Sequence, residues 1–138
     1  MKNILLLLFA ITILFDAYSQ GNELQFNRVV NESSTITVSS QFALENAGSI
    51  IVPANKVLKI TSASIYQSSG NSMSQNRLSL KIGNHVVFIV DGVSAETKQN
   101  SFPLWLESGN HSVLVSKGLI GTADLTWSIS GVEFNVVQ

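Results

Sequence analysis

Two histidines in a repeated phrase are the first candidates for chemistry in this sequence. His85 and His111 each follow a Gly-Asn pair, in GNHVVFIV (83–90) and GNHSVLVS (109–116). A structural zinc site requires four ligands, and no third ligand of suitable spacing accompanies these two imidazoles. We therefore expect no metal site. Each histidine is better explained as the first residue after a hairpin turn, where the ring caps the edge of the core and reaches water.

The carboxylates are the second group that could do chemistry, and they are scattered along the chain. Asp91 and Glu96 share one polar segment, but glycoside hydrolysis requires two carboxyl groups held at a defined separation across a cleft. The sequence also has no Gly-x-Ser-x-Gly elbow, no His-Glu-x-x-His motif, no phosphate-binding glycine loop and no cysteine. We predict a protein that is not an enzyme and uses no cofactor.

An exposed aromatic residue is the best candidate for binding a ligand. We expect Trp105 to point outward from a strand, where an indole ring can stack on a sugar, whereas Trp127 belongs to the core. Polar segments at 67–76 and 91–101 are expected to converge at one end of the molecule. The candidate ligand-binding residues are Trp105, Tyr66, Asn71, Asn76, Asp91 and Glu96.

The start of the chain predicts export. Lys2 precedes an apolar run from Ile4 to Phe15, and the following Ala-Tyr-Ser matches a signal-peptidase site. We predict a signal peptide at 1–19, cleaved after Ser19, and a secreted or periplasmic domain at 20–138. The apolar run is too short to span a membrane, so no membrane insertion is expected.

Net charge and cysteine content limit the classes of partner that the chain can bind. The net charge is −1 and no basic cluster is present, which argues against nucleic acid as a partner. The chain has no cysteine, so it cannot form the disulfides that usually stabilise small exported domains. Its stability must come from sheet packing, and we expect a homo-oligomer.

Short runs of alternating apolar and polar residues, separated by Gly, Asn and Ser, indicate β-strands throughout residues 20–138. About nine such strands predict an all-β fold, a two-sheet antiparallel sandwich of the jelly-roll type. The expected strands are 24–30, 35–44, 49–52, 56–66, 77–82, 85–90, 102–106, 111–116 and 123–137.

The repeated Gly-Asn pairs predict two hairpins of similar geometry. Both residues tolerate a positive φ, as primed two-residue turns require. The pairs expected across Gly83-Asn84 are Ile82 with His85, Leu80 with Val87, and Leu78 with Ile89. Across Gly109-Asn110, Leu104 and Leu106 are expected to lie opposite Val113 and Val115. The Gly-Asn turns should then lie together at one end of the sandwich.

The last strand changes its alternation. Its apolar residues have one parity before Ser130-Gly131 and the other parity after it: Leu125, Trp127 and Ile129, then Val132, Phe134 and Val136. A β-bulge at Ser130-Gly131 would keep all of them on the inner face, and glycine favours such a bulge.

The outward face of the two hairpins is more apolar than a solvated sheet requires. We expect another subunit to cover it, the alternative being a cover formed by the chain itself. The predicted interface residues are Val86, Phe88, Val90, Trp105 and Leu114.

Three phrases carry a resemblance to known proteins: IVPANKVLKI (51–60), FPLWLESGN (102–110) and ISGVEFNVV (129–137). They are similar to those of small secreted Bacteroidota β-sandwiches that have no assigned activity. The strand–turn–strand ending of the chain resembles the tumour-necrosis-factor-like and complement-type jelly-roll heads, which associate as trimers. The resemblance implies a jelly roll that self-associates, and it assigns no functional residue.

These observations favour an exported, non-catalytic β-sandwich that acts in self-association and protein recognition at or outside the cell surface. The alternative is a carbohydrate-binding module that uses an exposed tryptophan and polar end loops. In both cases the partner is a protein or a glycan.

Overall fold

The computed structural model describes residues 23–70, 77–91, 96–99, 102–118 and 120–137, and every regular element in them is a β-strand. Within these residues, no helix is long and apolar enough to cross a membrane. The predicted leader lies outside the described residues. The strands are β1 (Glu23–Val38), β2 (Glu45–Val52), β3 (Lys56–Gly70), β4 (Leu78–Ile82), β5 (His85–Asp91), β6 (Glu96–Gln99), β7 (Leu104–Leu106), β8 (Gly109–Lys117) and β9 (Ala123–Val137).

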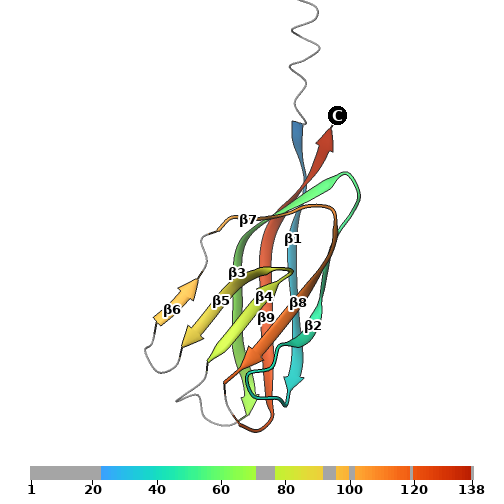
Figure 1. Ribbon diagram of the computed structural model, residues 1–138. Coiled ribbons are helices and arrows are strands. Elements are labelled where there is room, and N and C mark those ends of the chain that lie inside the picture. Colours follow the sequence, from blue (N-terminus) through green and yellow to red (C-terminus); the bar gives the residue numbers. More distant parts are fainter. Residues whose placement is uncertain (1–22, 71–76, 92–95, 100–101, 119, 138) are drawn as a thin grey trace, which may run out of the picture.

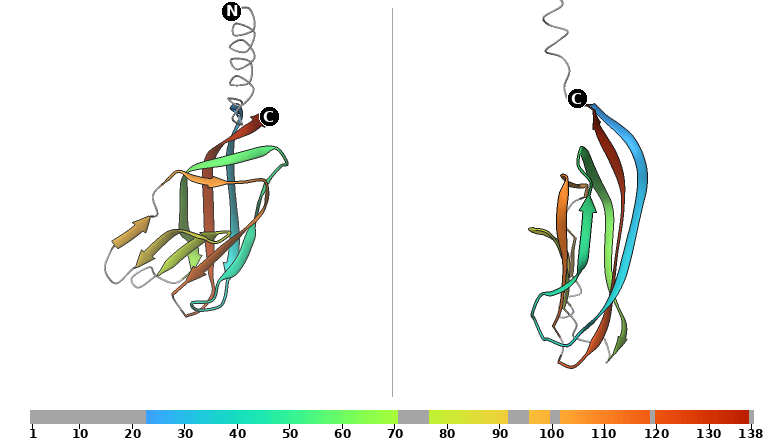
Figure 2. Two further views of the ribbon diagram at one scale, coloured as in Figure 1. Left: turned by 45° about the horizontal axis from the view of Figure 1, so that its top comes forward. Right: turned by 90° about the vertical axis from the view of Figure 1, so that its right-hand side faces the viewer.

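The strands form two sheets that pack face to face (Figure 1; Figure 2, right). Sheet A has the order β1-β9-β3-β7 and sheet B the order β2-β8-β4-β5-β6, and all pairings between these strands are antiparallel. With the short edge strand β6 set aside, this is the strand order of a jelly roll. The predicted fold class is confirmed.

Alternating side chains of both sheets fill the space between them. Leu125 and Trp127 of β9 and Val113 and Val115 of β8 are buried in one continuous core. Complete burial of side chains such as these contributes about 2 kcal/mol each. The indole Nε1 of Trp127 donates a hydrogen bond to the carbonyl oxygen of Ala47 at 3.2 Å, which connects sheet A to β2 of sheet B. Trp127 is therefore a core residue, as predicted.

The first predicted hairpin forms, with a different register. Gly83-Asn84 joins β4 to β5, and only Gly83 has a positive φ, 55°, as in a type II′ turn. Beyond the pair that closes the turn, β5 contains a bulge, so that Leu80 lies opposite Phe88 rather than Val87. The bulge interrupts the alternation on which the predicted outward set of β5 depended.

The second predicted hairpin is wrong. β7 pairs with β3 in sheet A, whereas β8 pairs with β2 and β4 in sheet B. Gly109-Asn110 therefore begins β8 after the chain has crossed from one sheet to the other. Leu106, Val113 and Val115 are buried, as they would be in a hairpin, so burial alone does not distinguish the two arrangements.

The bulge predicted at Ser130-Gly131 of β9 is also wrong, because it lies on the neighbouring strand. β9 alternates without interruption, and the extra residue lies on its neighbour β3, at Thr61, between the pairs Ile60–Gly131 and Ser62–Ser130. Gly131 is needed because a Cβ there would lie 2.5 Å from the carbonyl oxygen of Lys59. The glycine permits close approach of β3.

Three strand predictions need correction. β1 is one strand across 23–38, although two strands were expected there. β3 continues to Gly70, into the predicted loop at 67–76. The predicted loop at 91–101 contains β6, which pairs with the end of β5.

Candidate functional site

The unbroken alternation of β9 places its last apolar residues on the outside of sheet A. Glu133 is buried on the inner side, whereas Val132, Phe134 and Val136 are half-buried on the outer side. Their cross-strand partners on β1 are Val29, Phe26 and Leu24, and directly opposed residues share a face. We call these six residues the β1/β9 apolar face: Leu24, Phe26, Val29, Val132, Phe134 and Val136.

This face is open to solvent. Phe26 is 64% exposed, Val29 62% and Leu24 47%. The start of β1 and the end of β9 extend beyond the rest of the sandwich (Figure 1; Figure 2, right). Exposed aromatic and aliphatic side chains that gather on one face mark an interaction surface, whereas isolated ones do not.

A buried carboxylate fixes the strands beneath this face. The Glu133 side chain is 2% exposed, and it accepts hydrogen bonds from Lys56 Nζ at 3.0 Å, Arg28 Nε at 3.2 Å and Asn27 Nδ2 at 2.5 Å. Burial raises the pKa of Glu133, but these hydrogen bonds and the Arg28 charge outweigh it and hold the pKa below its ordinary value. The carboxylate thereby links β1, β3 and β9 in a defined register.

A bulge on β1 makes this network possible. Asn27 is the extra residue between Phe26 and Arg28, so that Asn27 and Arg28 both reach Glu133 while Phe26 and Val29 keep their outward positions. Polar inner contacts and apolar outer side chains therefore coexist on this part of β1.

Trp105 lies on the outer side of sheet A, next to the β1/β9 apolar face. Its indole is 45% exposed, as expected from the sequence. One contact is with Phe134, at a centroid distance of 5.9 Å and an interplanar angle of 36°, and Lys59 Nζ lies 5.3 Å from the ring centroid. These two contacts hold the ring in place while nearly half of it remains open.

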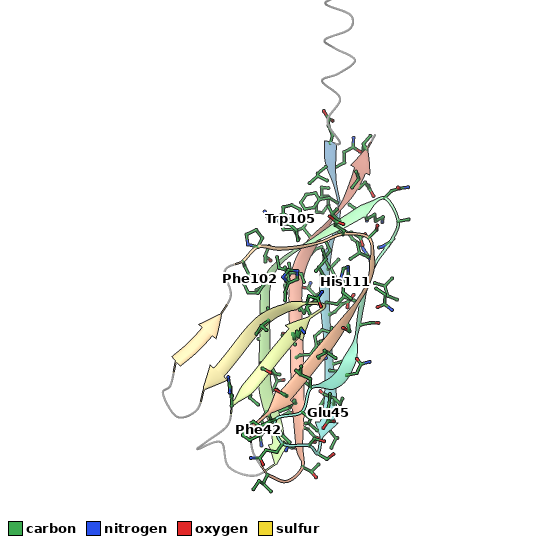
Figure 3. The ribbon with its side chains drawn as sticks, in the orientation of Figure 1. Phe42, Glu45, Phe102, Trp105 and His111 are labelled. Carbon is green, nitrogen blue, oxygen red and sulfur yellow. The ribbon has the colours of Figure 1, made fainter. Side chains whose placement is uncertain are left out.

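The two Gly-Asn pairs meet at one end of the sandwich, as predicted, and line an open hollow of about 510 Å³. Small-molecule sites commonly have volumes of roughly 300–1,000 Å³. Figure 3 shows Trp105 and His111 at this end, and Phe42 and Glu45 at the other. We call it the Gly-Asn hollow, and its lining residues are Gly83, Asn84, His85, Trp105, Leu106, Glu107, Asn110, His111 and Ser112.

His111 lies next to both Gly-Asn pairs. A Cβ at Gly83 would lie 3.7 Å from His111 Nδ1, and one at Gly109 would lie 3.9 Å from Nε2. Nε2 donates a hydrogen bond to the carbonyl oxygen of Glu107 at 2.9 Å, and Gly83 N–H donates to Ser112 O at 2.8 Å. The ring is half-buried and follows a sheet crossing, not a hairpin turn. Within the described part of the chain, no three His, Cys, Asp or Glu side chains are grouped to hold a metal ion.

The predicted interface residues do not form one surface. Trp105 belongs to sheet A, whereas Val86, 40% exposed, and the half-buried Leu114 lie on the outer side of sheet B. The side chains of Phe88 and Val90 lie outside the described residues.

The chain partly covers the outer side of sheet B by itself. Phe42 and Leu44, from the connection between β1 and β2, line a groove there together with Val86. Phe42 N–H donates to Lys117 O at 2.8 Å, and Gln41 Nε2 donates to Gly118 O at 2.9 Å, which fix this connection. The internal cover, the sequence-based alternative, is thus present in part.

The other predicted ligand-binding residues lie away from Trp105 or outside the described residues. Tyr66 is exposed on β3 seven positions after Lys59, about 20 Å along the strand from Trp105. Asp91 and Glu96 pair with each other between β5 and β6, and their side chains are not among those described. Asn71 and Asn76 lie outside the described residues.

The β1/β9 apolar face was not predicted from the sequence. A signal for half of it was present in ELQFNRVV, where Leu24 and Phe26 alternate with polar residues. The side to which they point depends on the bulge at Asn27 and on pairing with β9, which are not visible in the sequence.

Comparison of the chain with protein-family models, with curated proteins and with solved structures gave no match.

Proposed function

We propose that this protein is an exported, non-catalytic jelly roll that acts in self-association and protein recognition at or outside the cell surface, through the β1/β9 apolar face. The observation that supports this most strongly is the exposure of Phe26 and Val29, 64% and 62%, on one face of paired strands. Export follows from the leader predicted at residues 1–19.

A second copy of the chain is the occupant that fits this face best. Among the strands that the structure describes, β1 pairs with β9 alone and forms an edge of sheet A, so the surface can continue into a neighbouring copy at that edge. A two-fold arrangement would place the same apolar face on both sides of the interface. The net charge of −1 gives little repulsion between copies.

The absence of cysteine supports the same proposal. A chain without disulfides gains stability when association buries apolar area that the monomer leaves in water. Burial of Phe26 and Val29 in an interface would remove the two most exposed side chains of the face, each contributing about 2 kcal/mol.

Light scattering on residues 20–138 tests the proposal with matched variants. The double variant Phe26→Ser/Val29→Ser should reduce the mass from that of an oligomer to that of a monomer. Ile51→Ser, at an exposed position on β2 of sheet B, is the control and should keep the parental mass. An oligomer that survives the double variant, or is lost in Ile51→Ser, would place the interface elsewhere.

A further inference from the structure

The Gly-Asn hollow is a second surface, and self-association through the β1/β9 apolar face does not require its polar lining. We infer that this hollow binds a neutral pyranose sugar, with Trp105 as the stacking platform and Asn84, Asn110 and Glu107 as hydrogen-bonding groups. The sequence suggested Trp105 as a sugar contact beside the loops at 67–76 and 91–101. The structure instead places it beside the two Gly-Asn pairs.

Trp105 has the properties of a stacking platform. Its ring is held by Phe134 at 5.9 Å and by Lys59 at 5.3 Å, yet it is 45% exposed. The apolar C–H face of a pyranose packs on such a ring, and a ring already fixed by its neighbours loses little conformational freedom when a ligand binds.

The polar lining suits a ligand with many hydroxyl groups. Asn84, Asn110 and Ser112 are exposed and offer both donors and acceptors, and the exposed carboxylate of Glu107 accepts hydrogen bonds. A sugar presents hydroxyls that donate and accept at neighbouring carbons, so a mixed set of this kind can pair with it in full.

The same lining disfavours charged ligands. Of the described residues that line the hollow, none is Lys or Arg, and the Lys59 ammonium, 5.3 Å from the Trp105 ring, is the one cation described beside it. A phosphate or a nucleic acid, which needs several positive partners, would find too few there. Glu107 is the single carboxylate among them, whereas a calcium ion takes six to eight oxygen ligands. These features favour an uncharged ligand, and the mixed donors and acceptors beside an aromatic ring fit a sugar.

The backbone makes the hollow a preformed site. The β4–β5 turn is tied to β8 by the hydrogen bond from Gly83 N–H to Ser112 O, and His111 packs between Gly83 and Gly109. The walls therefore come from two segments of the chain, 83–85 and 105–112, which are already joined by a hydrogen bond. Binding would not have to order them.

The test uses an array of neutral oligosaccharides of glucose, galactose, mannose and N-acetylglucosamine, followed by calorimetric titration with the best-bound one. Trp105→Ala should weaken binding by at least about tenfold, because the platform is lost, and Asn110→Ala by about fivefold. Trp105→Phe, which keeps an aromatic ring, should retain most of the affinity.

Asn31→Ala is the matched control, because Asn31 is exposed on β1 and does not line the hollow. It should bind like the parent. An array without any bound oligosaccharide, or binding that is unchanged in both Trp105→Ala and Asn110→Ala, would overturn the inference. If Trp105→Ala does not fold, the calorimetric titration of Asn110→Ala alone tests the inference. Asn110→Ala should also keep the parental mass in light scattering, so failure of this inference is distinct from failure of self-association.

Discussion

The imidazole of His111 packs against Gly83, where a Cβ would lie 3.7 Å from Nδ1. The residue that suggested metal chemistry in the sequence thus serves as a structural contact between β8 and the β4–β5 turn. The repeated Gly-Asn-His phrase brings two chain segments to one place, although only the first copy forms a hairpin.

His111→Ala should therefore destabilise the fold more than His85→Ala. His111 is half-buried and donates to Glu107 O, so its loss should lower the free energy of unfolding by about 1–2 kcal/mol. His85 is exposed, and its loss should change that free energy by less than about 0.5 kcal/mol. Urea unfolding of both variants measures the difference, and equal effects would contradict the role assigned to His111.

The two tryptophans give a second matched comparison. Trp127→Phe removes the hydrogen bond to Ala47 O inside the core and should cost about 1–2 kcal/mol of unfolding free energy. Trp105→Phe, at an exposed position, should cost less than about 0.5 kcal/mol. Chemical denaturation followed by circular dichroism tests this, and a larger loss at Trp105 would reverse the assignment of the inner and outer indole.

Gly131→Ala should be strongly destabilising, because its Cβ would lie 2.5 Å from the backbone oxygen of Lys59. We expect a loss of about 2 kcal/mol or more, with Ser130→Ala as the neighbouring control near the parental value. Thermal unfolding measures both. A Gly131→Ala variant as stable as the parent would show that β3 does not approach β9 so closely.

Low pH should destabilise the folded chain, because Glu133 becomes protonated. Its pKa in the folded chain is lower than its ordinary value of 4.5, so its contribution to stability is complete above that value and is lost as the pH falls through the folded pKa. Glu133→Gln should lower the unfolding free energy near neutral pH by about 1–2 kcal/mol. The further loss of unfolding free energy below pH 4.5 should be smaller in this variant than in the parent.

Part of the acid dependence should survive in Glu133→Gln. Hydrogen bonds from Ser69 and then Thr37 also lower the pKa of Asp124. Denaturant titrations at several pH values separate the two groups. An unchanged pH dependence in Glu133→Gln would show that the Lys56 and Arg28 contacts do not stabilise the folded chain.

The fold class was predictable because alternation marks inward residues reliably. Leu125, Trp127 and Ile129 are buried as their spacing predicts. The same alternation cannot tell which sheet a strand joins, since Leu106 of β7 and Val113 of β8 point into one core from opposite sheets. The mistaken second hairpin follows from that ambiguity.

The candidate surfaces were harder to predict, because they depend on distant partners. The bulge expected in β9 would have turned Phe134 inward and Glu133 outward. The opposite orientation is stabilised by Arg28 and Lys56, which lie 105 and 77 residues away in sequence. No local pattern shows that a carboxylate at this position will find two cations. The β1/β9 apolar face results from that pairing.

Sedimentation equilibrium of unmodified residues 20–138 tests most directly whether a second copy of the chain covers the β1/β9 apolar face. We predict an average mass that rises with concentration to that of a homo-oligomer within the micromolar range. A mass that stays at that of one chain throughout this range would contradict the prediction.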